Sequence, residues 1–193
     1  MDIGLEILIL FLLILLNGLF ALSEIALVSI RRGRLAVLER EGHSGAAEAR
    51  ALSEDPQRFL PTIQVGITLV SVLTGVFGGA RIASHIQTWL ESIPSIAKFA
   101  PSLALTIVVV GTTYLTLVIG ELVPKQLALR NPEQTASRVA RPIAAFSRFG
   151  APAIWLLGRS TDLILRLFGR HGPPAHTVTE EELKMLITEG AAT

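Results

Sequence analysis

The 193-residue sequence has no cysteine and few charged residues. Only 17% of its residues are Asp, Glu, Lys or Arg, whereas 50% are hydrophobic. Soluble domains carry about a quarter charged residues, so this composition indicates a membrane protein. The lack of cysteine excludes disulfides, thiolate metal sites and cysteine nucleophiles. With a formal net charge of +1, the chain also has no electrostatic basis for binding nucleic acid.

Recognisable catalytic motifs are missing as well. The four histidines, His43, His85, His171 and His176, do not have the spacing of zinc ligands. The sequence contains neither an H-E-x-x-H motif nor a known nucleophile motif. We therefore do not expect the chain to be an enzyme.

Three long apolar segments predict membrane-spanning helices at about residues 5–30, 59–80 and 102–123. At about 1.5 Å per residue, each crosses a hydrocarbon core of roughly 30 Å. The loop over residues 31–58 is rich in Ala, Glu and Arg and predicts soluble helices that end at Asp55-Pro56. The expected fold is an all-α membrane protein whose transmembrane domain covers residues 1–141.

The distribution of basic residues predicts the orientation. Ten basic residues flank the cytosolic side of this arrangement: Arg31, Arg32, Arg34, Arg40, Arg50 and Arg58 before the second segment, and Lys125, Arg130, Arg138 and Arg141 after the third. The loop between the second and third segments offers only Arg81 and Lys98. The positive-inside rule therefore places the N-terminus outside and the C-terminus in the cytosol of a multi-pass protein of the cell (inner) membrane.

Residues 142–170 are apolar enough for a fourth span, but their arginines favour another interpretation. Arg141, Arg148, Arg159 and Arg166 follow one another at intervals of 7, 11 and 7 residues, which places them within roughly 20° on an ideal helix. An apolar helix with an arginine edge is typical of helices lying at the cytosolic membrane interface. Pro142 and Pro152 predict a break or kink in this stretch.

Residues 171–193 read as a linker followed by the start of a further region. Gly172-Pro173-Pro174 is a linker, and Thr179-Glu180-Glu181-Glu182 has the spacing of a capping box that opens a helix. We expect this helix to lead into a cytosolic part of a longer chain.

Polar residues interrupt the apolar segments at helical spacing. In the first segment, Asn17 and Glu24 share a helix face, and Ser23 precedes Glu24. Small and hydroxyl-bearing residues recur three or four apart in the other two segments: Thr68, Ser71, Gly75 and Gly78, then Thr113, Thr116 and Gly120. Close helix packing is the simpler interpretation of these Thr and Gly stripes.

Glu121, at the end of the third segment, has two interpretations. Either it lies at the interface and pairs with Lys125 one turn on, or it faces the bundle interior, where an unpaired charge costs several kcal/mol. Pro124 favours the second interpretation, because it has no N–H for the carbonyl of Gly120 and its ring crowds that carbonyl.

The freed carbonyl, the Glu121 carboxylate, the serine hydroxyls and the Asn17 amide together predict an all-oxygen cation site. Hard cations such as Mg²⁺ prefer such ligands, whereas soft or imidazole-seeking metals do not. A single carboxylate does not separate Mg²⁺ from Na⁺.

These motifs are similar to those of a known family. Residues 120–125 (G-E-L-V-P-K) resemble the G-E-x-x-P-K signature of the CorC / cyclin M (CNNM) magnesium transporter family. Residues 17–27 resemble its first transmembrane motif, and Asp55-Pro56 with residues 62–71 resembles its second. The helix predicted at residues 179–183 resembles the family's lead-in to a CBS pair.

The resemblance implies a homodimer with three transmembrane helices per subunit and Mg²⁺ bound largely dehydrated between them. It implies Mg²⁺ export across the plasma membrane, coupled to Na⁺. Carried over by motif, the ligands are Ser23, Ser71, Gly75 and Gly120 carbonyls, and Glu121, with Asn17 close by and with Pro124, Lys125 and Glu24 in support. The chain ends before the CBS pair, so CBS domains are expected partners in a full-length chain, and no nucleotide site is expected here.

Two alternative functions remain open at the level of sequence. The polar residues could serve only to pack the helices of a membrane anchor or sensor. The same scaffold could also transport Na⁺ or protons.

Overall fold

The computed structural model describes residues 3–167, and within this range every regular element is helical. The elements are α1 (Ile3–Val28), α2 (Arg32–Arg40), α3 (Ala46–Glu54), α4 (Pro56–Glu91), the 3₁₀ helix η1 (Ala97–Phe99), α5 (Ala100–Leu117), the π-helix η2 (Val118–Leu122), α6 (Val123–Arg130) and α7 (Pro132–Leu167). The predicted all-α class is confirmed.

Three helical stretches are long and apolar enough to cross a membrane, as predicted. They are Ile3–Val28, Phe59–Glu91 and Ala97–Arg130, the last made of η1, α5, η2 and α6. In a helix, the backbone N–H and C=O groups bond to one another, and they therefore need no hydrogen bonds from the surrounding hydrocarbon, which offers none. Large apolar side chains such as Leu12, Val76 and Val110 are exposed on these helices, as is expected where lipid replaces water. The chain is therefore a multi-pass membrane domain.

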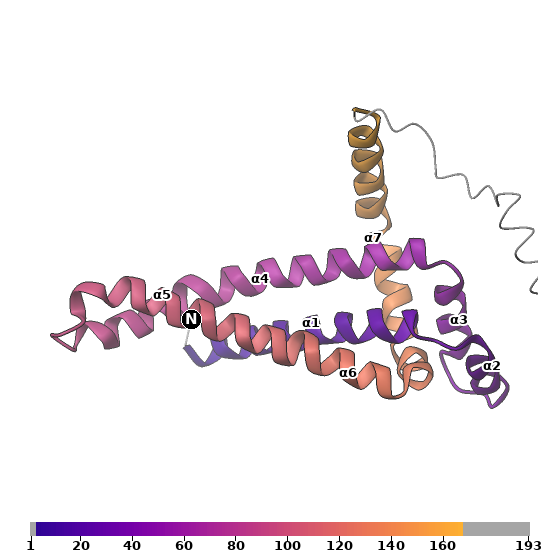
Figure 1. Ribbon diagram of the computed structural model, residues 1–193, viewed down its shortest axis with the longest axis horizontal. Helices are drawn as coiled ribbons and strands as arrows, with labels where there is room; N and C mark the ends of the chain where they lie inside the picture. Colours follow the sequence, from indigo (N-terminus) through magenta and orange to yellow (C-terminus); the bar gives the residue numbers. More distant parts are fainter. Residues whose placement is uncertain (1–2, 168–193) are drawn as a thin grey trace, which may run out of the picture. The chain divides into compact units, whose positions relative to one another are not determined.

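The helix ends differ from the predicted bounds in two places. α4 runs to Glu91 rather than to about residue 80, because Arg81 ends the apolar run without ending the helix. The turn between α4 and α5 consequently lies beyond the first turn of α1 (Figure 1). The third span continues to Arg130, past the predicted end at residue 123, and it changes from α to π geometry on the way.

α1 packs between α4 on one side and η2–α6 on the other. Glycines on α4 permit this close packing: a Cβ on Gly66 would lie 2.8 Å from the Phe20 ring, and a Cβ on Gly78 would lie 2.8 Å from Leu10 Cδ1. Gly78 therefore serves helix packing, as the small-residue stripe indicated. Thr68, Ser71 and Gly75 of the same stripe are exposed within the single chain.

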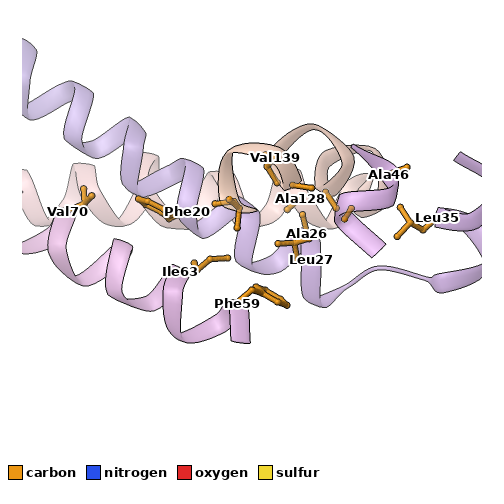
Figure 2. Close-up of a cluster of buried hydrophobic side chains, with 14 residues drawn as sticks. Phe20, Ala26, Leu27, Leu35, Ala46, Phe59, Ile63, Val70, Ala128 and Val139 are labelled. Carbon is orange, nitrogen blue, oxygen red and sulfur yellow. The ribbon is translucent and has the colours of Figure 1, made fainter. Parts of the chain in front are cut away.

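The predicted helical loop over residues 31–58 folds as α2 and α3. Its α3 helix ends at Glu54, directly before Asp55-Pro56, as expected. Both helices contribute to one buried apolar cluster that also includes α1, α4, α6 and the first half of α7 (Figure 2). Phe59, Ile63 and Leu35 are among its largest fully buried side chains. This cluster joins the end of the membrane helices to the loop that follows the first span.

α3 also contacts α7 directly. Gly45, which precedes α3, has φ +90°, and a Cβ there would lie 2.0 Å from the carbonyl oxygen of Ser137. Nearby, Arg141 Nε donates to Glu48 Oε1 at 3.0 Å. A hydrogen bond from its own backbone N–H, and then Arg141, hold the pKa of Glu48 below its ordinary value. These contacts fix α3 against the first half of α7.

The chain divides into two units, Met1–Ile154 and Trp155–Thr193. In the first unit, α7 buries Ala136, Val139, Ala140 and Ile143. In the second, residues 155–167 are exposed throughout. α7 continues through Pro142 and Pro152, so neither proline ends the helix as a break would have required. The predicted linker at residues 172–174 and the predicted helix at residues 179–183 lie outside the described residues.

Candidate functional site

A buried hydrogen bond links α1 to the third span. Asn17 Nδ2 donates to the carbonyl oxygen of Gly120 at 3.0 Å. Residue 124 would normally donate its N–H to this carbonyl, but it is proline and has none. The carbonyl that the sequence predicts to be free from its helix is thus bound by a side chain of another helix.

The backbone around Gly120 is π-helical. In η2, the N–H of Val123 donates to the carbonyl of Val118, five residues earlier. Such single π turns are rare in proteins, and those that do occur often lie at functional sites. Sequence reasoning recognised the disturbance at Pro124 but not its π geometry.

α1 and η2 approach one another at backbone distance. A Cβ on Gly18 would lie 3.0 Å from Pro124 Cγ and 3.2 Å from the carbonyl oxygen of Ile119. A Cβ on Gly120 would lie 3.1 Å from the carbonyl oxygen of Ile14. Sequence reasoning did not identify Gly18, whose only signal is its place beside Asn17 in an apolar run.

The oxygen of the Asn17 amide is buried. Asn17 is 3% exposed, and its Oδ1 atom accepts no hydrogen bond from residues 3–167. A buried acceptor without a donor costs about 1–3 kcal/mol. An amide oxygen in this position can accept a hydrogen bond from water or coordinate a cation.

Two carboxylates from different helices share one ammonium group. Lys125 Nζ lies 2.9 Å from Glu121 Oε1 and 3.7 Å from Glu24 Oε2. The side chains are partly exposed, at 30% for Lys125, 41% for Glu121 and 25% for Glu24. The pairing of Glu121 with Lys125, one of the two sequence interpretations, is therefore present. Glu24 of α1, which the family resemblance places in support of the site, also contacts this ammonium, although its pairing with Lys125 was not specified.

The remaining predicted ligands make other contacts or are exposed in the single chain. Ser23 is fully buried, and its Oγ donates to the carbonyl of Leu19 at 2.6 Å. Ser71 and Gly75 lie on the exposed face of α4. Within residues 3–167, no hydrogen bond connects Ser71 with Asn17 or Glu121. The contacts thus form two groups, Asn17–Gly120–Pro124 and Glu24–Glu121–Lys125. Among the described residues, no hydrogen bond or ion pair joins Ser23, Ser71 or Gly75 to either group.

Titratable metal ligands are scarce in the described part of the chain. No group of three His, Cys, Asp or Glu side chains converges within residues 3–167. A cation bound by Glu24 and Glu121 would need carbonyl, amide, hydroxyl or water oxygens for its other ligands. A cleft of about 220 Å³ lies elsewhere, between α2 and the start of α7, and is lined by Arg34, Val37, Leu38, Glu41, Asn131, Glu133 and Gln134.

Three apolar spans joined by polar contacts define the chain as a multi-pass, α-helical membrane domain. Comparison with known proteins places it more closely. Residues 7–193 match the family described as the Cyclin M transmembrane N-terminal domain, and the chain belongs to this CNNM family.

Bacterial relatives cover almost the whole chain. It is 44% identical over 98% of its length to a UPF0053 protein of Synechocystis, and 35% identical over 92% to the UPF0053 protein YhdT of Bacillus subtilis. It is 28% identical over 93% of its length to the polyamine export protein of Haemophilus influenzae. The chain spans 42%, 39% and 41% of these relatives, so it corresponds to less than half of each.

Proposed function

We propose that this domain carries Mg²⁺ across the cell membrane, with the ion held between α1 and the η2–α6 segment. One observation carries the proposal. Two carboxylates from different helices, Glu24 and Glu121, meet within membrane-spanning stretches that also contain a carbonyl lacking its helical donor. Charged groups in such stretches are costly and are typical of ion pathways.

The chemistry of the available ligands supports a hard cation. Glu24, Glu121, the Gly120 carbonyl and Asn17 Oδ1 are all oxygen donors, which Mg²⁺ prefers. The family resemblance favours net export coupled to Na⁺. The basic loops favour an N-terminus outside the cell.

Ser23, Ser71 and Gly75 belong to the proposed site through helix movement. Binding of the ion would draw the exposed α4 face toward Glu121 and free the Ser23 hydroxyl from Leu19. The exposed hydroxyl and glycine stripe of α4 supports a homodimer. The third span supports it too, since only 17% of its most apolar 18-residue stretch is buried within the single chain.

Replacing Glu121 tests the proposal. We expect Glu121→Gln to weaken Mg²⁺ binding at least ~100-fold, because the substitution removes a charged ligand while keeping its shape. Calorimetry in detergent measures the affinity, and circular dichroism verifies the helical content. Glu91→Gln is the matched control, because it alters an exposed carboxylate at the C-terminal end of α4. This variant should bind Mg²⁺ as the wild type does. Equal affinities for all three proteins would contradict the proposal.

A polyamine is the second candidate cargo. One relative is named a polyamine export protein, and Glu24 and Glu121 already hold an ammonium group, that of Lys125. Fluxes of Mg²⁺ and of labelled spermidine, measured in the same proteoliposomes, separate the two cargoes. Flux dependent on Na⁺ or pH alone indicates a Na⁺ or proton transporter, and no flux of any cation indicates an anchor or sensor.

The side chains in the second half of α7 support a position of this segment at the cytosolic membrane surface. Leu156 and Leu163 are exposed on it, and the Arg159 guanidinium lies 5.5 Å from the centre of the Trp155 ring. An aromatic ring beside a cation is typical of the headgroup level. An interfacial helix therefore fits this segment better than a fourth span does.

Quenching of Trp155 distinguishes these two positions. In a Trp89→Phe background, Trp155 is the only tryptophan. We expect lipids brominated near the headgroup to quench its fluorescence more strongly than lipids brominated near the chain end. We expect Arg159→Gln with Arg166→Gln to weaken the quenching in vesicles containing anionic lipid, since each arginine near such a surface contributes about 1 kcal/mol. Strongest quenching from the bilayer centre would instead indicate a fourth span.

A further inference from the structure

The Lys125 ammonium contacts two carboxylates rather than one. It connects two helices that are distant in sequence: Glu121 lies one turn before it, and Glu24 lies on α1. Glu121 Oε1 accepts a hydrogen bond from this ammonium, and Glu24 Oε2 lies within ion-pair distance of it. The proposed cation would need the same two carboxylates. An ammonium and a metal ion compete for carboxylate lone pairs at such short range.

We propose that Lys125 is a built-in counter-ion that holds the two carboxylates between transport events and that the cargo cation displaces. This inference rests on the proposed function, because it assigns a role to a residue at the same site. The lysine side chain suits such a role, since its charge sits at the end of a long, flexible stem. The Lys125 side chain is 30% exposed, so it is not enclosed by packed neighbours, and a long stem of this kind lets the charged head move away from the carboxylates.

The charges of the three side chains explain why a counter-ion is needed. Glu24 and Glu121 together carry two negative charges, and Lys125 reduces the sum to one. When Mg²⁺ binds and Lys125 swings away, the two carboxylates are neutralised by the ion. Without the lysine, the protein would have to rearrange with two uncompensated charges in a low-dielectric setting, which is strongly unfavourable. The lysine also keeps the affinity low enough for the ion to leave, as transport requires.

Replacing Lys125 by an uncharged residue of similar length tests the inference. We expect Lys125→Met to bind Mg²⁺ about tenfold more tightly, because it removes the competing ammonium. The same variant should transport Mg²⁺ more slowly at saturating concentration. Without the lysine, no positive charge replaces the ion at the two carboxylates when the ion leaves, or while the empty protein returns to its starting state. Lys125→Arg keeps the competing positive charge and should therefore not show the tighter Mg²⁺ binding of Lys125→Met. Calorimetry with MgCl₂ in detergent measures the affinity, and a Mg²⁺ indicator in proteoliposomes measures the flux.

Each outcome has a distinct meaning. Unchanged or weaker Mg²⁺ binding by Lys125→Met, with wild type binding normally, overturns the counter-ion role and leaves Lys125 a structural residue. If the wild-type protein binds no Mg²⁺, the proposed function fails first, and the inference falls with it. Lys125→Gln, a shorter and polar replacement, is measured in parallel in case the methionine variant does not fold. Opposite shifts in affinity for the two uncharged variants would likewise contradict the inference.

Discussion

Gly45→Ala should destabilise the domain by about 3–5 kcal/mol. The left-handed backbone at Gly45, with φ +90°, disfavours any side chain, and a Cβ would also lie 2.0 Å from the carbonyl oxygen of Ser137. That contact is with backbone, which cannot move aside as a flexible side chain can, so α3 must separate from α7. Thermal denaturation in detergent, followed by circular dichroism, measures the change.

Gly42→Ala is the matched control for Gly45→Ala. Gly42 also has a positive φ, of +77°, but a Cβ there meets nothing within 4 Å. Gly42→Ala should therefore lose only the free energy of placing a side chain on left-handed backbone, about 1–2 kcal/mol. Equal losses for the two variants would show that the Ser137 contact contributes nothing to stability.

Gly18→Ala should separate α1 from the π-helix, with a loss of about 2–3 kcal/mol in stability and of most Mg²⁺ binding. The new Cβ would lie 3.0 Å from Pro124 Cγ and 3.2 Å from the carbonyl oxygen of Ile119. Both neighbours are rigid, so the helix itself must shift. The shift would also stretch the hydrogen bond between Asn17 and Gly120, which lies next to it.

The control for Gly18→Ala lies in the same helix. A Cβ on Gly4 meets nothing within 4 Å, so Gly4→Ala should be neutral, or stabilising by up to about 1 kcal/mol through helix propensity. Melting temperature and calorimetric Mg²⁺ affinity are measured for both variants. If Gly18→Ala keeps the wild-type affinity and stability, the close approach of α1 to η2 is not required.

Much of the fold follows from local properties of the sequence. The three spans were predictable because an apolar run of this length has few other stable structures. The boundary between α3 and α4 was predictable from Asp55-Pro56, since proline starts helices well and continues them badly. The disturbance at Gly120 followed from the missing N–H of Pro124.

Features that depend on how helices cross could not be predicted in this way. The contact of Asn17 with Gly120 joins residues 103 positions apart, and that of Lys125 with Glu24 joins two helices. Helical spacing places residues on a face but does not say which neighbour that face meets. For the same reason, the sequence did not indicate that Ser71 and Gly75 would be exposed in the single chain. The extension of α4 past Arg81 was missed because hydropathy reports the end of an apolar run, not of a helix.

The π-helix sets the rotational phase of everything that follows it in the third span. A π turn contains one residue more than an α turn, and each helical residue corresponds to about 100° of rotation. If residues 118–122 were wound as a regular α-helix, α6 would be turned by about that angle relative to α1. Pro124 would then no longer face Gly18, and Lys125 would point away from Glu24. A single inserted residue thus determines whether the two halves of this polar region meet at all.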